Sequence, residues 1–314
     1  MQIWTEKYRP RAFSEIIGQE KIVERIASLV KQKNIPNMLF AGPAGVGKST
    51  MALVIAKEMY GDKVSECFLE LNSSDERGID VVRGVIKDFS RTRTMSEAPF
   101  KIIFLDECDQ LTREAQNALR RTMETFSQNV RFILSANYSS KIIDPIQSRC
   151  LAFRFTSLSK ENIKKVIQNI AEKEKIKIEE SAFDSLYELS DGDVRRVVNL
   201  MQSCASKNNS INSALVYELM SIAEPKEINI ILEAAIQGKF LFSREKLLDT
   251  MLKYGLSGLD LMKQIQKEIL RLNISEVQKA KLIERCGEIE FRMVEGSDEF
   301  LQLEALLASF SLLK

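Results

Sequence analysis

Apolar residues recur along this chain with two different periods, which separate its first half from its second. In the first half, short apolar runs alternate with stretches of helical spacing, and strands that alternate with helices predict a parallel sheet with right-handed crossovers. The predicted strands are residues 37–41, 66–71, 101–105, 130–136 and a closing run at 153–155. The predicted helices are residues 19–33, 50–60, 78–90 and 113–126. Residues 1–17 are expected to be irregular.

From Ser159 onward the spacing is helical and no convincing strand is found. The first group of predicted helices is residues 160–174, 180–190, 194–207 and 212–221. Pro225 restarts the chain after a short polar break, and a final helical block includes residues 259–272, 278–293 and 299–313. The pattern therefore predicts an α/β domain, a small helical domain and a helical C-terminal bundle.

Composition excludes several classes of chemistry. The chain has 314 residues, a net charge of +1 and no histidine, so histidine acid–base catalysis is ruled out and any basic surface must be local. Its five cysteines are scattered without C-x-x-C spacing, which argues against a zinc site or a disulfide framework. The N-terminus lacks an apolar signal core and no run of 18 apolar residues occurs, so we expect a soluble intracellular protein without a membrane segment.

Residues 42–49 read GPAGVGKS and match the phosphate-binding pattern G-x-x-x-x-G-K-[ST]. Glycines leave the backbone N–H groups free to wrap an anion, while Lys48 supplies charge for the β- and γ-phosphates and Ser49 a hydroxyl ligand for Mg²⁺. A predicted strand precedes the loop and a predicted helix follows it, as this motif requires. The sequence thus predicts a nucleoside triphosphate site. Its expected members are Gly42, Pro43, Ala44, Gly45, Val46, Gly47, Lys48, Ser49 and Thr50.

Two further strand ends carry polar residues that suit the same site. Four apolar residues lead into Asp106 and Glu107, which are expected to hold Mg²⁺ through water and to polarise the attacking water, respectively. Asn137 follows the next strand, where it could orient that water or contact the γ-phosphate; an ordinary turn residue is the alternative. Arg149 could complete a neighbouring chain's site and stabilise transition-state charge, or be a solvated surface arginine.

Four stretches of the chain resemble one family, the small subunit of replication factor C, the AAA+ clamp loader of archaea and eukaryotes. They are residues 6–10, 71–78, 116–124 and 146–150. The resemblance is specific from Trp4 to about Gln202, and the C-terminal bundle matches only in length and helical character. The brief N-terminus and absent extensions resemble the archaeal form. The resemblance implies a P-loop AAA+ domain at 1–157, a helical lid at 158–223 and an all-helical collar at 224–314.

The resemblance also assigns roles to single residues. Thr5 and Ile17 would border the adenine, although the family more often has valine at position 5. The other assignments are Asn137 as sensor 1, Arg195 as the sensor 2 arginine, Arg149 as the arginine finger acting in trans, and Asn72 as the residue that restrains the catalytic glutamate until DNA binds. Cys108 stands where the family usually has alanine, and no change of mechanism is expected from it.

Arg83 and Lys87 lie four residues apart and share a helix face. In the family this face tracks one strand of duplex DNA through backbone contacts, which carry no sequence information; a solvated helix face is the alternative. The resemblance further implies ATP and Mg²⁺ as cofactors. The implied partners are the sliding clamp (PCNA), a large subunit and further small subunits in a hetero-pentamer, and primer–template DNA. A cytoplasmic, nucleoid-associated protein would suit them.

The leading hypothesis is a DNA-stimulated ATPase subunit that opens the sliding clamp and loads it onto primer–template DNA during replication. One alternative is a ring member that binds ATP without hydrolysing it, which the intact Lys48, Glu107 and Arg149 argue against. The other is a different AAA+ motor, such as a branch-migration helicase or an unfoldase. No aromatic–glycine pore loop or winged helix is evident to support that alternative.

Overall fold

The structure is a computed structural model that describes residues 2–74, 82–92 and 99–312, with the backbone alone for Val82 and Arg83. It divides into two compact units. The first contains residues 1–177 and 186–202, and the second contains residues 178–185 and 203–314. The three-domain division of the chain stays a prediction.

The first unit is built on a five-stranded parallel sheet, which confirms the predicted α/β fold. Its strands are β1 (Met38–Ala41), β2 (Phe68–Asn72), β3 (Lys101–Asp106), β4 (Val130–Ala136) and β5 (Leu151–Arg154). Their order is β2-β3-β4-β1-β5, so β1 lies between β4 and β5. The carboxyl ends of β1, β3 and β4 therefore meet at one edge, where ligands of such sheets bind.

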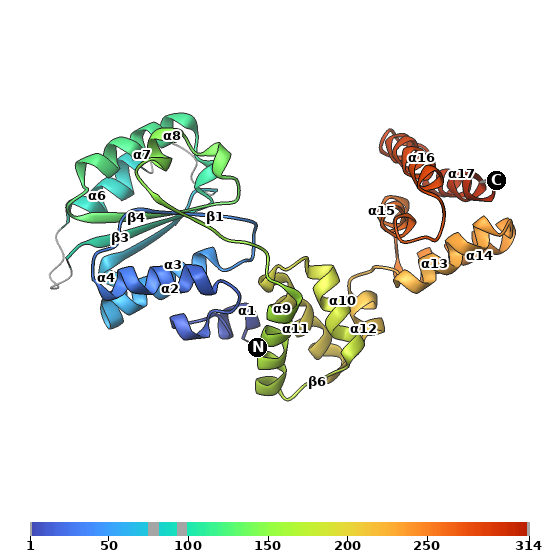
Figure 1. The fold of residues 1–314 in the computed structure, drawn as a ribbon, viewed down its shortest axis with the longest axis horizontal. Coiled ribbons are helices and arrows are strands. Elements are labelled where there is room, and N and C mark those ends of the chain that lie inside the picture. The colour runs from blue at the N-terminus through green and yellow to red at the C-terminus, as the bar shows by residue number, and fades with distance from the viewer. Residues whose placement is uncertain (1, 75–81, 93–98, 313–314) are drawn as a thin grey trace. The chain divides into compact units, whose positions relative to one another are not determined.

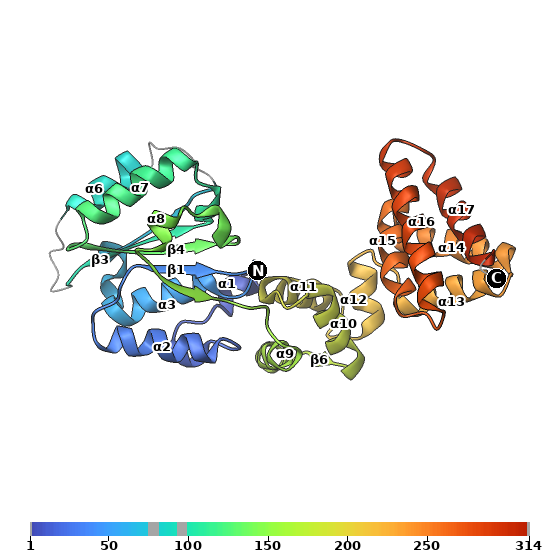
Figure 2. The same ribbon diagram turned by 45° about the horizontal axis from the view of Figure 1, so that its top comes forward.

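Helices cover both faces of this sheet (Figures 1 and 2). On one face lie α2 (Glu20–Lys31) and α3 (Lys48–Tyr60), and on the other α6 (Lys87–Arg91) and α7 (Arg113–Thr125). Successive side chains of β3 point to opposite faces of the sheet. Ile103 and Leu105 belong to the core formed with Leu119 of α7. The remaining short elements include η2 (Gly61–Lys63), α4 (Val64–Cys67), η4 (Cys108–Gln110), η5 (Ser139–Lys141) and α8 (Asp144–Gln147).

The helices after the sheet are α9 (Lys160–Glu174), α10 (Glu180–Ser190), α11 (Val194–Lys207) and α12 (Ser213–Leu219). The expectation of no strand after Ser159 is wrong, because β6 (Lys177–Ile178) and β7 (Ser210–Ile211) form a two-stranded sheet. The backbone N–H of Glu179 also donates to the carbonyl of Ile211, at 3.0 Å. Two-residue strands are too short for an apolar period to reveal.

The expectation of an irregular N-terminus is also wrong. The structure has a one-turn helix, α1 (Trp4–Lys7), and a 3₁₀ turn, η1 (Phe13–Glu15). Trp4 is 5% exposed, and its backbone N–H donates to Oε1 of Gln202 at 2.9 Å. A tertiary contact thus stabilises a helix too short to be stable alone.

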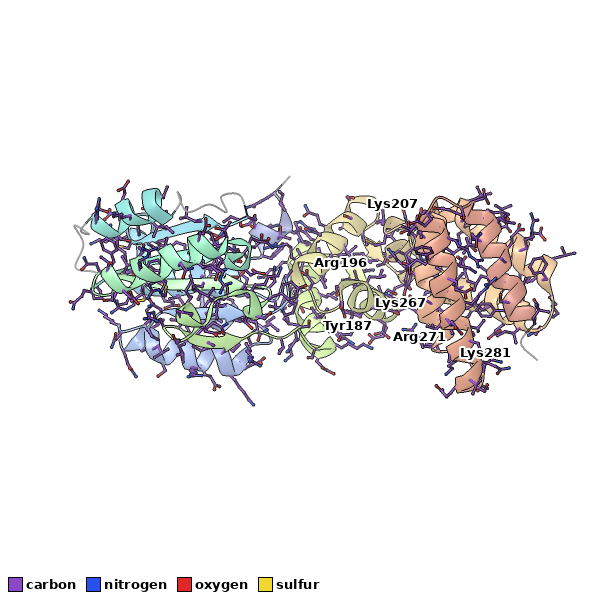
Figure 3. The ribbon with its side chains drawn as sticks, turned by 90° about the horizontal axis from the view of Figure 1, so that it is seen from above. Tyr187, Arg196, Lys207, Lys267, Arg271 and Lys281 are labelled. Carbon is purple, nitrogen blue, oxygen red and sulfur yellow. The ribbon has the colours of Figure 1, made fainter. Side chains whose placement is uncertain are left out.

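The C-terminal part of the second unit consists of helices in the described residues, as predicted (Figure 1). They are α13 (Pro225–Ile236), α14 (Phe240–Tyr254), α15 (Gly258–Ile269), α16 (Glu276–Val294) and α17 (Glu299–Ser311). All five contribute buried apolar side chains to one core. Charged residues such as Lys267 of α15 and Lys281 of α16 lie outside this core, at exposed positions (Figure 3). Serine caps define two helix starts, and Ser275 forms a capping box with Gln278 at the start of α16.

Candidate functional site

The loop between β1 and α3 favours glycine at three of its positions. Gly45 has a φ of +70°, and a Cβ there would come within 1.8 Å of the Asp193 carboxylate. At Gly42 a Cβ would come within 2.3 Å of the carbonyl oxygen of Phe155. Gly47, with a φ of +98°, precedes α3, whose first residue is Lys48. The loop thus presents backbone at a helix N-terminus, an arrangement that suits an anion.

The Lys48 side chain lies inside this loop. It is largely buried, and Nζ donates to the carbonyl oxygens of Gly42 and Pro43, each at 2.7 Å, and to Oδ1 of Asn137 at 2.9 Å. Burial lowers the pKa of Lys48, and the carboxylates of Asp106 and Asp109 oppose that shift. The structure therefore brings together the loop lysine and the strand-tip asparagine, which are 89 residues apart.

The hydroxyl of Ser49 and the carboxylate of Asp106 also meet. Oγ of Ser49 donates to Oδ2 of Asp106 at 2.6 Å, and Oδ1 of Asp106 accepts from the backbone N–H of Glu107 at 2.9 Å. Hydroxyl and carboxylate oxygens are ligands that suit Mg²⁺. The donor set on this edge of the sheet therefore fits the predicted metal.

Glu107 is held in a left-handed backbone conformation, with φ of 50° and ψ of 37°. Such a conformation costs a non-glycine residue about 1–2 kcal/mol. The turn is braced by the Asp106 bond and by the backbone N–H of Gln110, which donates to the Glu107 carbonyl at 2.8 Å. The carboxylate predicted to polarise water thus lies on a fixed turn that lines the cavity.

One cavity of about 640 Å³ lies within the first unit, a size suited to a small-molecule ligand. Its lining includes Gly45, Lys48, Ser49, Asp106, Glu107 and Asn137. Thr5 and Ile17, predicted to border adenine, line the same cavity, as does Arg195 of α11. Lining residues that were not predicted as site residues include Tyr8, Arg9, Val166, Ile170, Lys173 and Val198. They come from the N-terminal segment and from α9 and α11, so only tertiary structure joins them.

Two contacts fasten other segments beside this cavity. The N–H of Val194 donates to the carbonyl of Gly45 at 3.1 Å, so the start of α11 bonds directly to the glycine loop. Glu174 of α9 accepts hydrogen bonds from the Tyr8 hydroxyl and from the Lys7 ammonium, the latter at 2.6 Å. The Lys7 bond lowers the pKa of Glu174. No signal in the sequence pointed to Glu174.

Several predicted site residues do not line the cavity, among them Gly42 and Pro43 of the loop, Asn72 and Arg149. Arg149 follows α8, and its guanidinium contacts the Glu124 carboxylate at 2.6 Å and the Pro145 carbonyl oxygen at 2.7 Å. Asn72 ends β2 opposite Asp106 in register. Its Oδ1 accepts from the backbone N–H and the hydroxyl of Ser74, at 3.0 and 2.9 Å.

The predicted basic helix face is only partly described. Lys87 is exposed at the first position of α6, and the π-helical turn η3 (Val82–Ile86) precedes it. The side chain of Arg83 and residues 78–81 of the predicted helix lie outside the described residues. Elsewhere in the described chain no group of three acidic, cysteine or histidine side chains could hold a metal, and none of the five cysteines forms a disulfide. None of the helices that the structure describes could span a membrane.

Three family models together match most of the chain. The AAA ATPase family (ATPases associated with various cellular activities) matches residues 38–158, an RFC1-like AAA+ ATPase lid domain matches residues 160–216, and the replication factor C C-terminal domain matches residues 223–309. Proteins named replication factor C small subunit are similar over 99% of this chain. Those of Methanococcus vannielii and Methanococcus maripaludis are 50% and 49% identical, each over 99% of its own length. The Archaeoglobus fulgidus protein is 46% identical over 98% of its length.

Solved structures of Thermotoga maritima RuvB, a Holliday junction branch migration motor, are also similar. One has a TM-score of 0.56 and 20% identity, covering 73% of this chain and 79% of that one. A second structure, of a variant of the same motor, has the same TM-score with 19% identity, covering 82% of this chain and 91% of that one. At such identity the likeness concerns the fold alone.

Proposed function

The chain belongs to the replication factor C small-subunit family, and we propose that it opens a sliding clamp (PCNA) and loads it onto primer–template DNA during replication. Family membership makes it an AAA+ ATPase subunit of a clamp loader. One observation carries the finer proposal. Lys48, the Ser49–Asp106 pair and Asn137 meet around one cavity, while Arg149 lies outside it and contacts Glu124.

Within the cavity we assign Lys48 and the loop backbone to the phosphates of ATP, and Ser49 and Asp106 to Mg²⁺. When bound, Mg²⁺ neutralises phosphate charge during phosphoryl transfer. Glu107 accepts a proton from the attacking water, which Asn137 orients. Thr5 and Ile17 border the adenine, and Arg195 faces the phosphates from α11. The fit of these roles is supported by the Ser49–Asp106 bond and by the glycine-only positions of the loop.

Arg149 is assigned to the ATP of a neighbouring subunit. Its side chain is 38% exposed and engaged on the outside of α7, which suits delivery to another chain. Asn72 is assigned to restrain Glu107 until DNA binds and so to make hydrolysis DNA-stimulated. This role is supported by the position of Asn72 at the end of β2, beside Asp106, the residue that precedes Glu107.

Assembly with a large subunit and further small subunits in a hetero-pentamer is supported by two exposed apolar stripes. On α14 the stripe contains Leu241, Leu248 and Leu252, which are 77%, 38% and 74% exposed. On α16 the stripe contains Phe291 and Val294, which lie three residues apart and are 67% and 66% exposed. Large exposed apolar patches mark interaction sites, and two different stripes suit head-to-tail contacts around a ring.

A mixing experiment tests the shared site. Chains carrying Arg149→Ala are assembled with chains carrying Glu107→Gln, and the ATPase rate of the mixture is compared with each pure assembly. If Arg149 acts in trans, an intact Glu107 meets a neighbour's intact Arg149 in part of the mixed sites, so activity rises above both parents. An arginine finger contributes on the order of 10³–10⁵ in rate.

No recovery despite normal assembly would mean that every active site needs both residues in one chain, and would overturn the action in trans.

ATPase stimulation by clamp and primer–template DNA, compared with stimulation by junction DNA, separates clamp loading from a branch-migration motor. Stimulation by junction DNA alone would contradict the proposed function. A parent assembly that never hydrolyses ATP would instead favour a ring member that only binds it.

A further inference from the structure

One side chain, that of Gln147, fastens the segment carrying Arg149 to the segment that follows Asn137. Nε2 of Gln147 donates to the carbonyl oxygen of Ser139 at 3.1 Å and to that of Ile142 at 2.7 Å. The amide nitrogen has two hydrogens, so both are used. These two carbonyls bracket the turn that leaves Asn137.

The Asn137 end of this connection is tied to the phosphate-binding residues. Its Oδ1 accepts from Lys48, and its backbone N–H donates to Oδ1 of the buried Asp109 at 3.2 Å. At the other end the backbone N–H groups of Arg149 and Cys150 donate to the carbonyls of Ile146 and Gln147, at 3.0 and 3.1 Å. Residues 146–150 therefore form one continuous hydrogen-bonded turn.

Apolar packing also places the Arg149 segment against the core beside the Glu107 turn. Cys150 packs against the apolar core that contains Cys108, and Cys108 lies between Glu107 and Asp109. Burial raises the pKa of the Cys150 thiol to about 12, so this contact is apolar at neutral pH. Cys108, Ala136 and Cys150, which adjoin the Glu107, Asn137 and Arg149 turns, thus belong to one apolar core or pack against it.

We propose that Gln147 is a positioning residue that links Asn137 in one subunit's ATP site to Arg149, which acts on the ATP of the next subunit. A shift of the Asn137 turn moves the two carbonyls that hold Gln147, and the Arg149 turn moves with them. The inference rests on the proposed action of Arg149 in trans. The position of Arg149 toward the neighbouring subunit's ATP then depends on the phosphate-contacting residues of the chain that carries Arg149.

The test is Gln147→Glu, which removes both donors and sets a carboxylate against two carbonyl oxygens. We expect the single-turnover ATPase rate of the assembled complex to fall about 10- to 100-fold, because small misplacements of a catalytic group cost that much. ATP affinity of the free subunit should stay at the parent value, because Gln147 does not line the cavity. Gln168→Glu, on an exposed position of α9, is the charge-matched control and should keep the parent rate. Gln147→Ala should repeat the loss without the added charge.

The decisive comparison places Gln147→Glu in the Arg149→Ala background. If Gln147 acts through Arg149, the double variant has the same rate as Arg149→Ala alone. The inference would be overturned if Gln147→Glu lowered the rate of the Arg149→Ala variant as much as it lowers the parent rate. Parent rates for both single Gln147 variants would also overturn it. Neither outcome would contradict the action of Arg149 in trans. A parent rate for Arg149→Ala itself would overturn the proposed shared site and this inference together.

Discussion

Lys48 is a buried cation whose three hydrogen-bond acceptors all belong to the loop and strand tip around it. Burial lowers its pKa, so the ammonium is costly to hold there unless an anion or acceptors surround it. Glu107 differs from Lys48, because it lines the cavity from a turn with a left-handed backbone conformation. Substitutions of Lys48 and Glu107 should therefore affect ATP binding and ATP hydrolysis differently.

We expect Lys48→Ala to weaken ATP binding by at least about 100-fold, equivalent to roughly 2.7 kcal/mol, because the phosphates lose their main side-chain charge. Glu107→Gln should bind ATP like the parent and lose about 10²–10⁴ in turnover, since only the proton acceptor is removed. Equilibrium binding of a fluorescent ATP analogue and single-turnover hydrolysis measure the two effects. Unchanged affinity in the first variant, or unchanged turnover in the second, would contradict the assigned roles.

At the scale of elements, the glycine loop and the start of α11 form one bonded unit through Gly45 and Val194. Gly45→Ala should strain the loop by about 1–3 kcal/mol through its positive φ alone. The new Cβ would also collide with Asp193. We expect lower thermal stability of the first unit and weaker ATP binding.

Gly287→Ala is the matched control, because Gly287 lies inside α16 and a Cβ there meets nothing within 4 Å. That change should stabilise the chain by about 0.5–1 kcal/mol, since alanine restricts the unfolded backbone. Thermal unfolding with and without ATP checks both variants. A Gly45→Ala chain as stable as the parent would mean that the loop and α11 separate freely.

We propose that Lys87 of α6, together with Arg83 four residues before it, contacts the DNA backbone. Lys87→Glu should weaken primer–template binding by the assembled complex equally for all sequences and reduce the salt dependence of the affinity. Lys57→Glu, an exposed position on α3 across the sheet, is the control. Titrations at two salt concentrations measure the slope, and identical slopes for both variants would exclude this helix face.

At the scale of the whole molecule, the two apolar stripes predict how copies and partners associate. Leu252→Asp or Phe291→Asp should leave thermal unfolding of the isolated chain nearly unchanged, because both side chains are exposed, yet prevent assembly. Leu270→Asp, also exposed but outside both stripes, should assemble normally. Light scattering after gel filtration gives the masses. Full assembly by both stripe variants would show that other surfaces hold the ring together.

The sequence by itself determined the parallel sheet, most helix boundaries and the residues of the phosphate loop. Strand and helix periods are local properties, and a loop of glycines, lysine and serine is constrained by the shape of a phosphate. The sequence pattern did not reveal α1 within the first 17 residues, nor β6 and β7 after Ser159. Elements of two to four residues are too short to show a period.

Only the tertiary structure decided which distant groups meet. Tyr8 with Glu174, Val194 with Gly45, and Gln147 with the turn after Asn137 are contacts between segments that no periodic pattern connects. Each depends on side-chain reach and backbone direction after the sheet has formed. The left-handed Glu107 turn likewise arises from bonds made on both sides of it, since nothing in glutamate's own preferences favours a positive φ.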